Sequence, residues 1–149
     1  MENWPEVEIE VVRLNEDLPL PKYMSSGAAG MDLYAAENVF IDVGQIRLVP
    51  TGIKVAIPVG FELQIRPRSS LGLRGIGIIN SPGTVDADYR GEIKIPLINF
   101  GEQSFFIKKG NRIAQAVLCS VYRAKLKMVS HLKSTPRGEG GFGHTGGYN

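Results

Sequence analysis

Apolar and polar residues alternate along several short stretches of this chain of 149 residues. In EIKIPLIN, Ile93, Ile95 and Leu97 alternate with Glu92, Lys94 and Pro96. Successive side chains of a strand point to opposite faces of its sheet, so this pattern predicts strands with one buried face. The same alternation occurs in VEIEVVRL, near the start of the chain, and in RAKLKMVS, around Leu126 and Met128.

Turn-forming residues separate these stretches at short intervals, in the sequences DVGQ, PVG, SPG, FGEQ and KKGN. No window of ten or more residues has a convincing helical period, so we expect at most a turn or two of helix around residues 71–74. Pro96 is expected at a sheet edge or at a ladder position that needs no donor. Many short strands at this spacing predict an all-β fold, a jelly-roll-like β-barrel or sandwich.

The composition excludes several classes of protein. A net charge of +2 is too small to favour binding to nucleic acid or to a membrane surface. With Cys119 as the single cysteine, an internal disulfide is impossible, and two histidines cannot complete a structural zinc site. The first ten residues are acidic and no apolar run approaches about 20 residues, so we expect a cytoplasmic protein, with an organellar or viral setting left open.

The last thirteen residues, RGEGGFGHTGGYN, contain six glycines and too little apolar surface to fold alone. We therefore expect one β domain over residues 1–136 and a flexible tail over residues 137–149. The tail matches the dinucleotide-binding pattern G-x-G-x-x-G at Gly138, Gly140 and Gly143. That fingerprint requires a strand before it and a helix after it, so we reject the match.

Four stretches place charged or hydroxyl residues beside glycine or proline: AGMDLYA, PRSSLG, NSPGTVDADYRGEI and GNRIAQAV. Asp86 and Tyr89 in the third suit either a solvated hairpin or a small ligand, with the acid orienting a hydroxyl or water and the ring packing on a sugar. Arg68 and the two serines that follow it have the groups that bind phosphate. Asp32 is either a turn residue or an acid near a metal.

In this order, the four stretches and the tail resemble the five sequence motifs of the trimeric dUTPases, from AGMDLYA as the first to RGEGGFGHTG as the fifth. The resemblance implies a jelly-roll-like fold, a homotrimer with three shared active sites, and dUTP as the substrate. It divides the chain into a dUTPase β domain, residues 1–136, and a mobile lid, residues 137–149, that closes over a site built by neighbouring subunits.

The resemblance also implies residue roles. Asp86 would be the general base that activates water for attack at the α-phosphorus, giving dUMP and pyrophosphate, with Arg137 as the second catalytic residue and Mg²⁺ bridging the phosphates. Tyr89 would lie under the deoxyribose and exclude a 2′-hydroxyl, and Phe142 would stack on uracil. Asp32 would support the metal through water. The full substrate-binding set implied is Arg68, Ser69, Ser70, Gly72, Asn80, Gly83, Val85, Asp86, Tyr89, Arg112, Gln115, Arg137, Phe142, Gly143, His144 and Thr145.

Two positions depart from the pattern of the family. Asn111 stands where aspartate is usual, so the guanidinium network around Arg112 or Arg137 could lack a carboxylate partner. His144 replaces serine, and its imidazole could make closure of the tail dependent on pH.

Two other functions stay open at the level of sequence. A dCTP deaminase shares the fold, but Pro96 stands where such an enzyme needs a glutamate to move protons. A non-catalytic trimeric nucleotide-binding or sensor protein is the other alternative, although this chain keeps both Asp86 and the tail.

Overall fold

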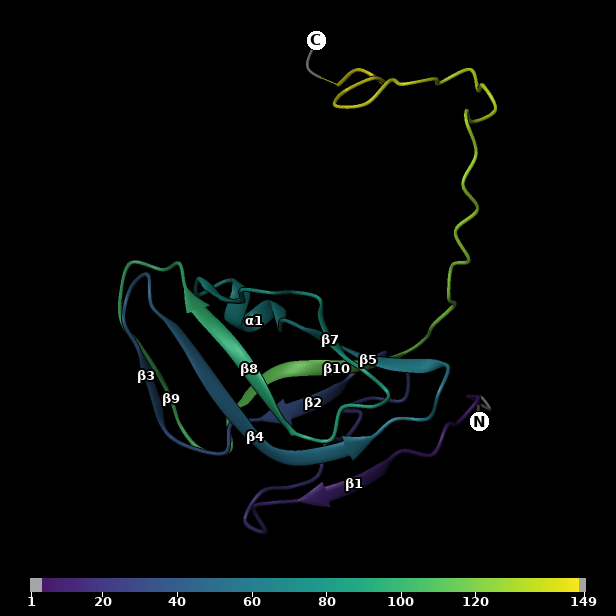
Figure 1. Cartoon of the computed structure of the whole chain (residues 1–149). Coiled ribbons are helices and arrows are strands. Elements are labelled where there is room, and N and C mark those ends of the chain that lie inside the picture. The colour runs from purple at the N-terminus through teal and green to yellow at the C-terminus, as the bar shows by residue number, and fades with distance from the viewer. Residues whose placement is uncertain (1–3, 148–149) are drawn as a thin grey trace.

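A computed structural model describes residues 4–147 of the chain (Figure 1). The first three residues of the predicted β domain and the last two of the predicted lid, residues 148 and 149, therefore lie outside the described residues. The described chain contains ten strands and one short helix. The elements are β1 (Glu10–Arg13), β2 (Met31–Tyr34), β3 (Val39–Ile41), β4 (Ile46–Ala56), β5 (Phe61–Arg66), α1 (Ser69–Gly72), β6 (Ile76–Ile78), β7 (Gly83–Val85), β8 (Glu92–Asn99), β9 (Phe105–Ile107) and β10 (Arg112–Ser120).

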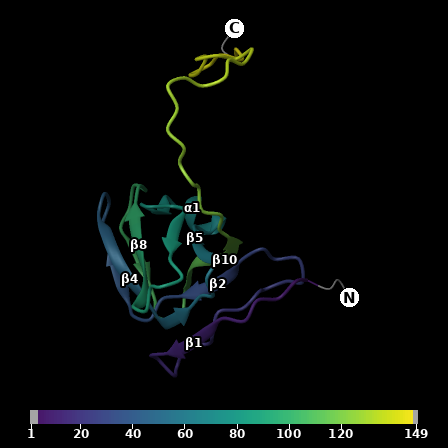
Figure 2. The ribbon, with the colours of Figure 1, turned by 45° about the vertical axis from the view of Figure 1, so that its right-hand side comes forward.

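The strands form three antiparallel sheets. The first has the order β1-β4-β8-β6, the second has the order β2-β10-β5-β7, and the third is the pair β3-β9. Figure 2 shows β4 and β8 in one layer, with β5, β10 and β2 in the layer beside it. This arrangement confirms the predicted all-β, jelly-roll-like class.

The core lies between the layers and follows the alternation read from the sequence. On β8, Ile93, Ile95 and Leu97 are buried, whereas Lys94 between them is exposed. Isoleucine and valine prevail among the other core residues from β4, β5, β6 and β10. β-Branched side chains fit a pleated surface that is packed on one face, which is the environment of these positions.

Pro96 lies on β8, which is an inner strand of its sheet, so the expectation of a sheet edge is wrong. The alternative expectation, a ladder position that needs no N–H donor, holds. The carbonyl of Pro96 accepts a hydrogen bond from the amide of Ile79, one residue beyond the end of β6. In an antiparallel ladder the nitrogen of Pro96 faces the same way as its carbonyl. The missing N–H therefore falls where the ladder with β6 has already ended.

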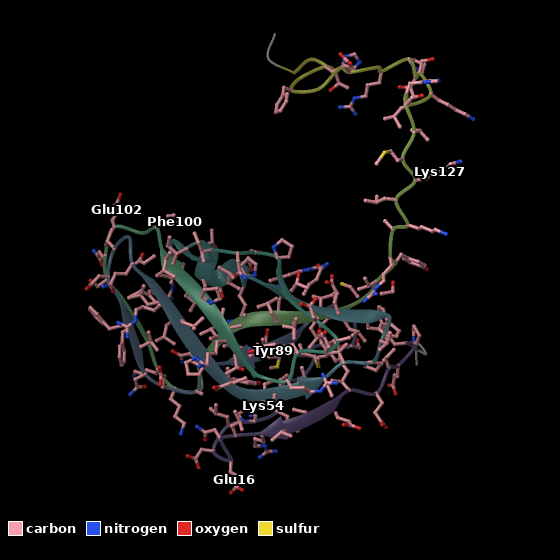
Figure 3. The ribbon with its side chains drawn as sticks, in the orientation of Figure 1. Glu16, Lys54, Tyr89, Phe100, Glu102 and Lys127 are labelled. Atoms are coloured by element: carbon pink, nitrogen blue, oxygen red, sulfur yellow. The ribbon has the colours of Figure 1, made fainter. Side chains whose placement is uncertain are left out.

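The strand predicted around Leu126 and Met128 is absent from the described residues of this single chain. After β10 the chain leaves the body as an extended arm, and both side chains are almost fully exposed. Lys127 in Figure 3 marks this arm, away from the β sheets. Alternation reports a tendency to form a strand, but a strand also needs a neighbour to pair with, and the arm finds none within its own chain.

Two smaller expectations are adjusted. The short helix is confirmed but begins earlier, at Ser69, and ends at Gly72. The first strand is only four residues long, and Val7 and Ile9 lie before it, half-buried. Among residues 4–147 no helix is long and apolar enough to cross a membrane.

Candidate active site

One group of predicted site residues forms a charged cluster where β2 and β10 meet the end of β5. Arg68 directs its Nε to Asp32 Oδ1 at 3.4 Å, and Arg112 donates from Nη1 to Asp32 Oδ2 at 3.1 Å. Arg68 also donates from Nη1 to the carbonyl of Arg112 at 3.1 Å. The side chain of Asp32 is 13% exposed, so one carboxylate shielded from water holds two guanidinium groups in place.

Gln115, whose role the sequence left unassigned, holds the start of the phosphate-binding stretch. Its Nε2 donates to the carbonyl of Pro67 at 3.0 Å. Gly30 makes this possible, because a Cβ there would lie 2.8 Å from Gln115 Oε1 and 3.2 Å from its Cβ. Gln115 is thereby tied to the residue directly before Arg68.

Asn111 does not leave the cluster short of a carboxylate. Its Oδ1 accepts a hydrogen bond from the amide of Lys108 at 2.9 Å and closes the turn between β9 and β10. An aspartate at this position could accept the same bond. Arg112 obtains its carboxylate from Asp32 instead, so the predicted gap in the network does not occur there.

The helix α1 follows Arg68 directly and presents exposed hydroxyl groups. Arg68 occupies the N-cap position in extended conformation, with φ −97° and ψ 133°. Its carbonyl accepts hydrogen bonds from the amides of Leu71 and Gly72. Ser69 and Ser70 are exposed on this turn.

A second group of predicted residues lines a pocket of about 190 Å³ beside β7. Asp86 and Tyr89 stand on its wall, together with Glu92, which the sequence reading did not include. Its lining also includes apolar side chains from β5 and β8. The complete lining is Ile65, Asn80, Gly83, Thr84, Val85, Asp86, Tyr89, Glu92, Ile93, Lys94 and Pro96.

The backbone comes close to the pocket at Gly83. A Cβ added there would lie 3.3 Å from Asn80 Nδ2 and 3.4 Å from the Cβ of Ile65. Ile65 pairs with Gly83 across the ladder of β5 and β7, and both residues line the pocket. The peptide bond between Ser81 and Pro82, in the loop that precedes β7, is cis.

The carboxylate of Asp86 is exposed, and among the described residues it has no hydrogen-bonding or ion-pairing side chain. Its backbone carbonyl accepts from the amide of Tyr89 at 3.1 Å, which brings the tyrosine back toward the pocket. The hydroxyl of Tyr89 donates to the carbonyl of Glu92 at 2.9 Å. Figure 3 shows Tyr89 against the body of the protein.

The two groups lie at opposite ends of β5. Val85 pairs with Leu63 near the beginning of this strand, so Asp86 follows opposite Glu62. Arg68 lies six residues further along an extended backbone, which corresponds to about 20 Å. Within one chain, therefore, the carboxylate and the arginine cluster lie far beyond the few ångströms at which two groups act on the same phosphoryl group.

The tail residues lie apart from both groups. The ring of Phe142 is fully exposed. Arg137 donates from Nε to the carbonyl of Gly140 at 2.8 Å, and the amide of His144 bonds to the carbonyl of Gly141. Thr145 and Gly143 belong to the same sequence of tight turns, in which Gly143 has a φ of +92°. The described hydrogen bonds of the tail are all local, so the single chain does not bring these residues to the pocket or to the arginines.

No group of three or more His, Cys, Asp or Glu residues that could hold a metal ion occurs within residues 4–147. Mg²⁺ commonly keeps several waters and is bound by one or two carboxylates together with the phosphates of a substrate. Binding of that kind does not require a metal cage made of protein side chains alone.

Comparison with known proteins assigns the chain to one family. The model of the family described as dUTPase matches residues 16–146. The chain belongs to the dUTPase family. A relative from Syntrophotalea carbinolica named "Deoxyuridine 5'-triphosphate nucleotidohydrolase" is 53% identical, over 94% of this chain and 97% of its own length. A relative of the same name from Caldanaerobacter subterraneus is 56% identical, over 88% of this chain and 90% of its own length.

Solved structures of dUTPases agree with this membership. The dUTPase of Staphylococcus bacteriophage 80alpha, described as a structure with dUPNHPP, is 27% identical and has a TM-score of 0.86, covering 93% of this chain and 98% of its own. A dUTPase from phage phi11 of S. aureus has a TM-score of 0.78 at 22% identity, covering 86% of this chain, and its description names a structural Mg(II) ion. The dUTPase resemblance read from the five motifs is confirmed, and so is the enzyme class that it implies.

Proposed function

We propose that this dUTPase-family protein hydrolyses dUTP to dUMP and pyrophosphate, with Asp86 as the general base. The observation that carries the proposal is the pocket of about 190 Å³ that has Asp86 and Tyr89 on its wall. A carboxylate without a protein partner beside an aromatic ring can orient water next to a sugar that rests on the ring. Curated relatives named for hydrolysis of this nucleotide give the substrate.

Recognition of the base is assigned to the loop before β7 and to β7 itself. Backbone groups around Asn80, Gly83 and Val85 would pair with the edge of uracil. Cytosine exchanges donor and acceptor at two positions of that edge, so fixed backbone groups would be left unpaired and buried against it, and cytosine would be rejected. The close packing around Gly83, where an added Cβ would lie 3.4 Å from the Cβ of Ile65, supports exclusion of the methyl group of thymine.

The phosphates are assigned to Arg68 and Arg112, with Ser69 and Ser70 as hydroxyl donors. Guanidinium groups bind phosphate through paired N–H donors, and they do so best when their direction is fixed beforehand. Asp32 supplies that fixed direction, since it holds both arginines before any ligand arrives. Gln115 restrains the backbone at Pro67 and so acts by positioning Arg68.

In the proposed reaction Asp86 accepts a proton from a water molecule as the water oxygen bonds to the α-phosphorus. The bond between the α-phosphorus and the oxygen that bridges to the β-phosphorus then breaks, and pyrophosphate leaves with that oxygen. Arg137, brought by the tail, would neutralise the charge that develops on the leaving group, as Arg68 does. The same carboxylate would also contact the 3′-hydroxyl of the deoxyribose.

Mg²⁺ bound to the triphosphate would reduce the negative charge that the arginines and the incoming water face. The dUTPase of phage phi11, whose description names a structural Mg(II) ion, shares the fold of this chain. Asp32 is the residue assigned to hold the metal, through water. Both of its oxygens are engaged by arginine, which favours a supporting role over direct ligation.

The separation of Asp86 from Arg68 supports sites that are shared between the subunits of a homotrimer. Two further features favour an assembly with neighbouring copies. The arm after β10 exposes Leu126 and Met128 to water. An apolar groove of about 1000 Å³, with Trp4 and Met31 in its lining, lies between the N-terminal segment and the second sheet. An exposed apolar arm and an open apolar groove on one chain fit an assembly in which each is covered by another copy.

The tail is proposed to act as a lid that orders on the nucleotide of a neighbouring site. Phe142 would stack on uracil, while His144 and Thr145 would contact the terminal phosphates. Glycines allow the backbone of the tail to approach the phosphates closely. Closure would exclude water other than the reacting molecule and bring Arg137 into place.

The test is a panel of dUTP, UTP, dTTP and dCTP with Mg²⁺, in which dUMP, pyrophosphate and ammonia are measured for the wild type and for Asp86→Asn. We expect dUMP and pyrophosphate from dUTP alone, and a loss of turnover of at least about 100-fold in the variant with binding of dUTP retained. Ammonia from dCTP would indicate a deaminase. Tight binding of dUTP without turnover would indicate a sensor protein, and an active Asp86→Asn variant would show that another residue is the base.

A further inference from the structure

The ring of Tyr89 is held by its own turn and by the first residue of β8. The hydroxyl donates to the carbonyl of Glu92 at 2.9 Å. Arg90 closes the same turn, because its Nη1 donates to the carbonyls of Ala87 at 2.7 Å and Tyr89 at 2.9 Å. Glu92 is itself fixed to β4, since its Oε1 accepts from the amide of Gly52 at 3.0 Å. The position of the ring is thus tied to the sheet.

Gly91 lies against the hydroxyl end of this ring. A Cβ added at Gly91 would lie 2.6 Å from Cζ of Tyr89 and 3.0 Å from its Cε2, and it would collide with the hydroxyl oxygen as well. Gly91 is not among the glycines of the chain with positive φ. Its backbone conformation is therefore open to any residue, and the space taken by the tyrosine ring is what requires glycine here.

We propose that Gly91 determines sugar specificity by seating Tyr89, an inference that rests on the proposed dUTPase function of the pocket. With glycine at this position the ring lies against the backbone and its hydroxyl reaches Glu92. The ring then forms a fixed wall of the pocket. If the ring of Tyr89 is held in place, the additional 2′-hydroxyl of a ribonucleotide clashes with it and the ribonucleotide is rejected. If the ring can move, the ribonucleotide can bind.

The effect of a side chain at Gly91 is local because the atoms it meets are at the far end of an exposed side chain. Tyr89 is 44% exposed, so its ring can turn outward into solvent. Such a movement would break the solvent-exposed hydrogen bond from the Tyr89 hydroxyl to the carbonyl of Glu92. It would leave the backbone of β8 in place. Substitution of Gly91 should consequently alter the pocket more than it alters the stability of the fold.

The test compares Gly91→Ala with the wild type by kcat/KM for dUTP and for UTP, together with the melting temperature. We expect kcat/KM for dUTP divided by kcat/KM for UTP to fall about ten-fold in Gly91→Ala. For dUTP, kcat should change less than KM. The melting temperature should stay within about 2 °C. Gly27→Ala is the matched control, because nothing lies within 4 Å of a Cβ there and its φ is not positive.

A second pair of variants separates seating of the ring from general damage. In a Tyr89→Ala background, Gly91→Ala should have no further effect on the ratio, since the ring that it displaces is gone. An unchanged ratio in the Gly91→Ala single variant, or a fall of the same size in the Tyr89→Ala background, would overturn the inference. If the wild type itself fails to hydrolyse dUTP or to prefer it to UTP, the proposed function fails, and the two failures are distinguishable.

Discussion

Replacing Asp32 by asparagine removes the one carboxylate that holds Arg68 and Arg112 together, while the size and shape of the side chain are nearly preserved. The amide could accept one hydrogen bond at its oxygen, but its NH₂ group would face the second guanidinium. Two cations would then lie next to each other without a counterion. The perturbation therefore tests whether Asp32 is a support for the arginines or chiefly a partner of the metal.

The size of the effect follows from how far each pair is shielded from water. The side chains of Arg68 and Asp32 are 22% and 13% exposed, and their contact at 3.4 Å is an ion pair without a hydrogen bond, so it should contribute about 1 kcal/mol. Arg112 is 40% exposed and its contact is screened, so its contribution should be about 0.5 kcal/mol. The sum of about 1.5 kcal/mol corresponds to a decrease in melting temperature of roughly 3–6 °C for a chain of this size.

The assay measures the melting temperature at one fixed protein concentration, together with the Mg²⁺ concentration that gives half-maximal turnover of dUTP. Asp17→Asn is the matched control, since Asp17 pairs with Lys109 at 3.0 Å in an exposed ion pair and should contribute no more than about 0.5 kcal/mol. We expect Asp32→Asn to raise KM for dUTP with little change in the Mg²⁺ requirement. A melting temperature equal to that of Asp17→Asn, together with a greatly increased Mg²⁺ requirement, would refute the supporting role.

The other predictions concern the core, the turn before β10 and the tail. Ile95→Ala should lower the free energy of unfolding by about 2–5 kcal/mol in urea at an unchanged m-value, because Ile95 is fully buried; a loss below about 1 kcal/mol would contradict this. Asn111→Asp should keep kcat/KM within about two-fold, since the acceptor for the amide of Lys108 is retained, and a larger change in steady-state kinetics would show that the residue has a role in the site. Removal of residues 137–149 should leave the melting temperature within about 2 °C but lower kcat at least about 100-fold; dissociation of the assembly in sedimentation would instead make the tail structural. Phe142→Trp should give a fluorescence signal that changes when dUpNHpp is added, and a constant signal would argue against stacking on the base.

The fold was predictable where a strand is buried on one face, because apolar and polar residues then alternate in the sequence. Ile93, Ile95 and Leu97 are buried because a strand with one covered face can tolerate polar residues only at every other position. The same pattern around Leu126 and Met128 gave a strand that the single chain does not form. Alternation contains no information about which chain supplies the partner, so this segment could not be placed from the sequence.

The residues of the candidate site could be proposed from the sequence, but the contacts between them could not. Motif order predicted Asp86 and Tyr89 as residues of one site, and both line one pocket. The pairing of Asp32 with two arginines depends on the register of β2 against β10, in which Asp32 lies opposite Gln115, and no local pattern specifies a register. No local pattern in the sequence distinguishes Gly91 from a turn glycine, because the ring that requires it belongs to Tyr89, whose direction only the structure gives.

The distance between Asp86 and Arg68 along β5 has a consequence for mixtures of copies. Suppose that each working site takes its base from one protomer and its arginines from another. A protomer that lacks the base then inactivates the site to which it contributes the base, but it can still contribute its arginines to a different site. Two inactive variants, Asp86→Asn and Arg68→Ala, should then regain part of the lost turnover when they are unfolded and refolded together, while neither recovers when it is refolded alone. By the same geometry, one defective subunit in an assembly would reduce the turnover of sites that it shares with wild-type subunits.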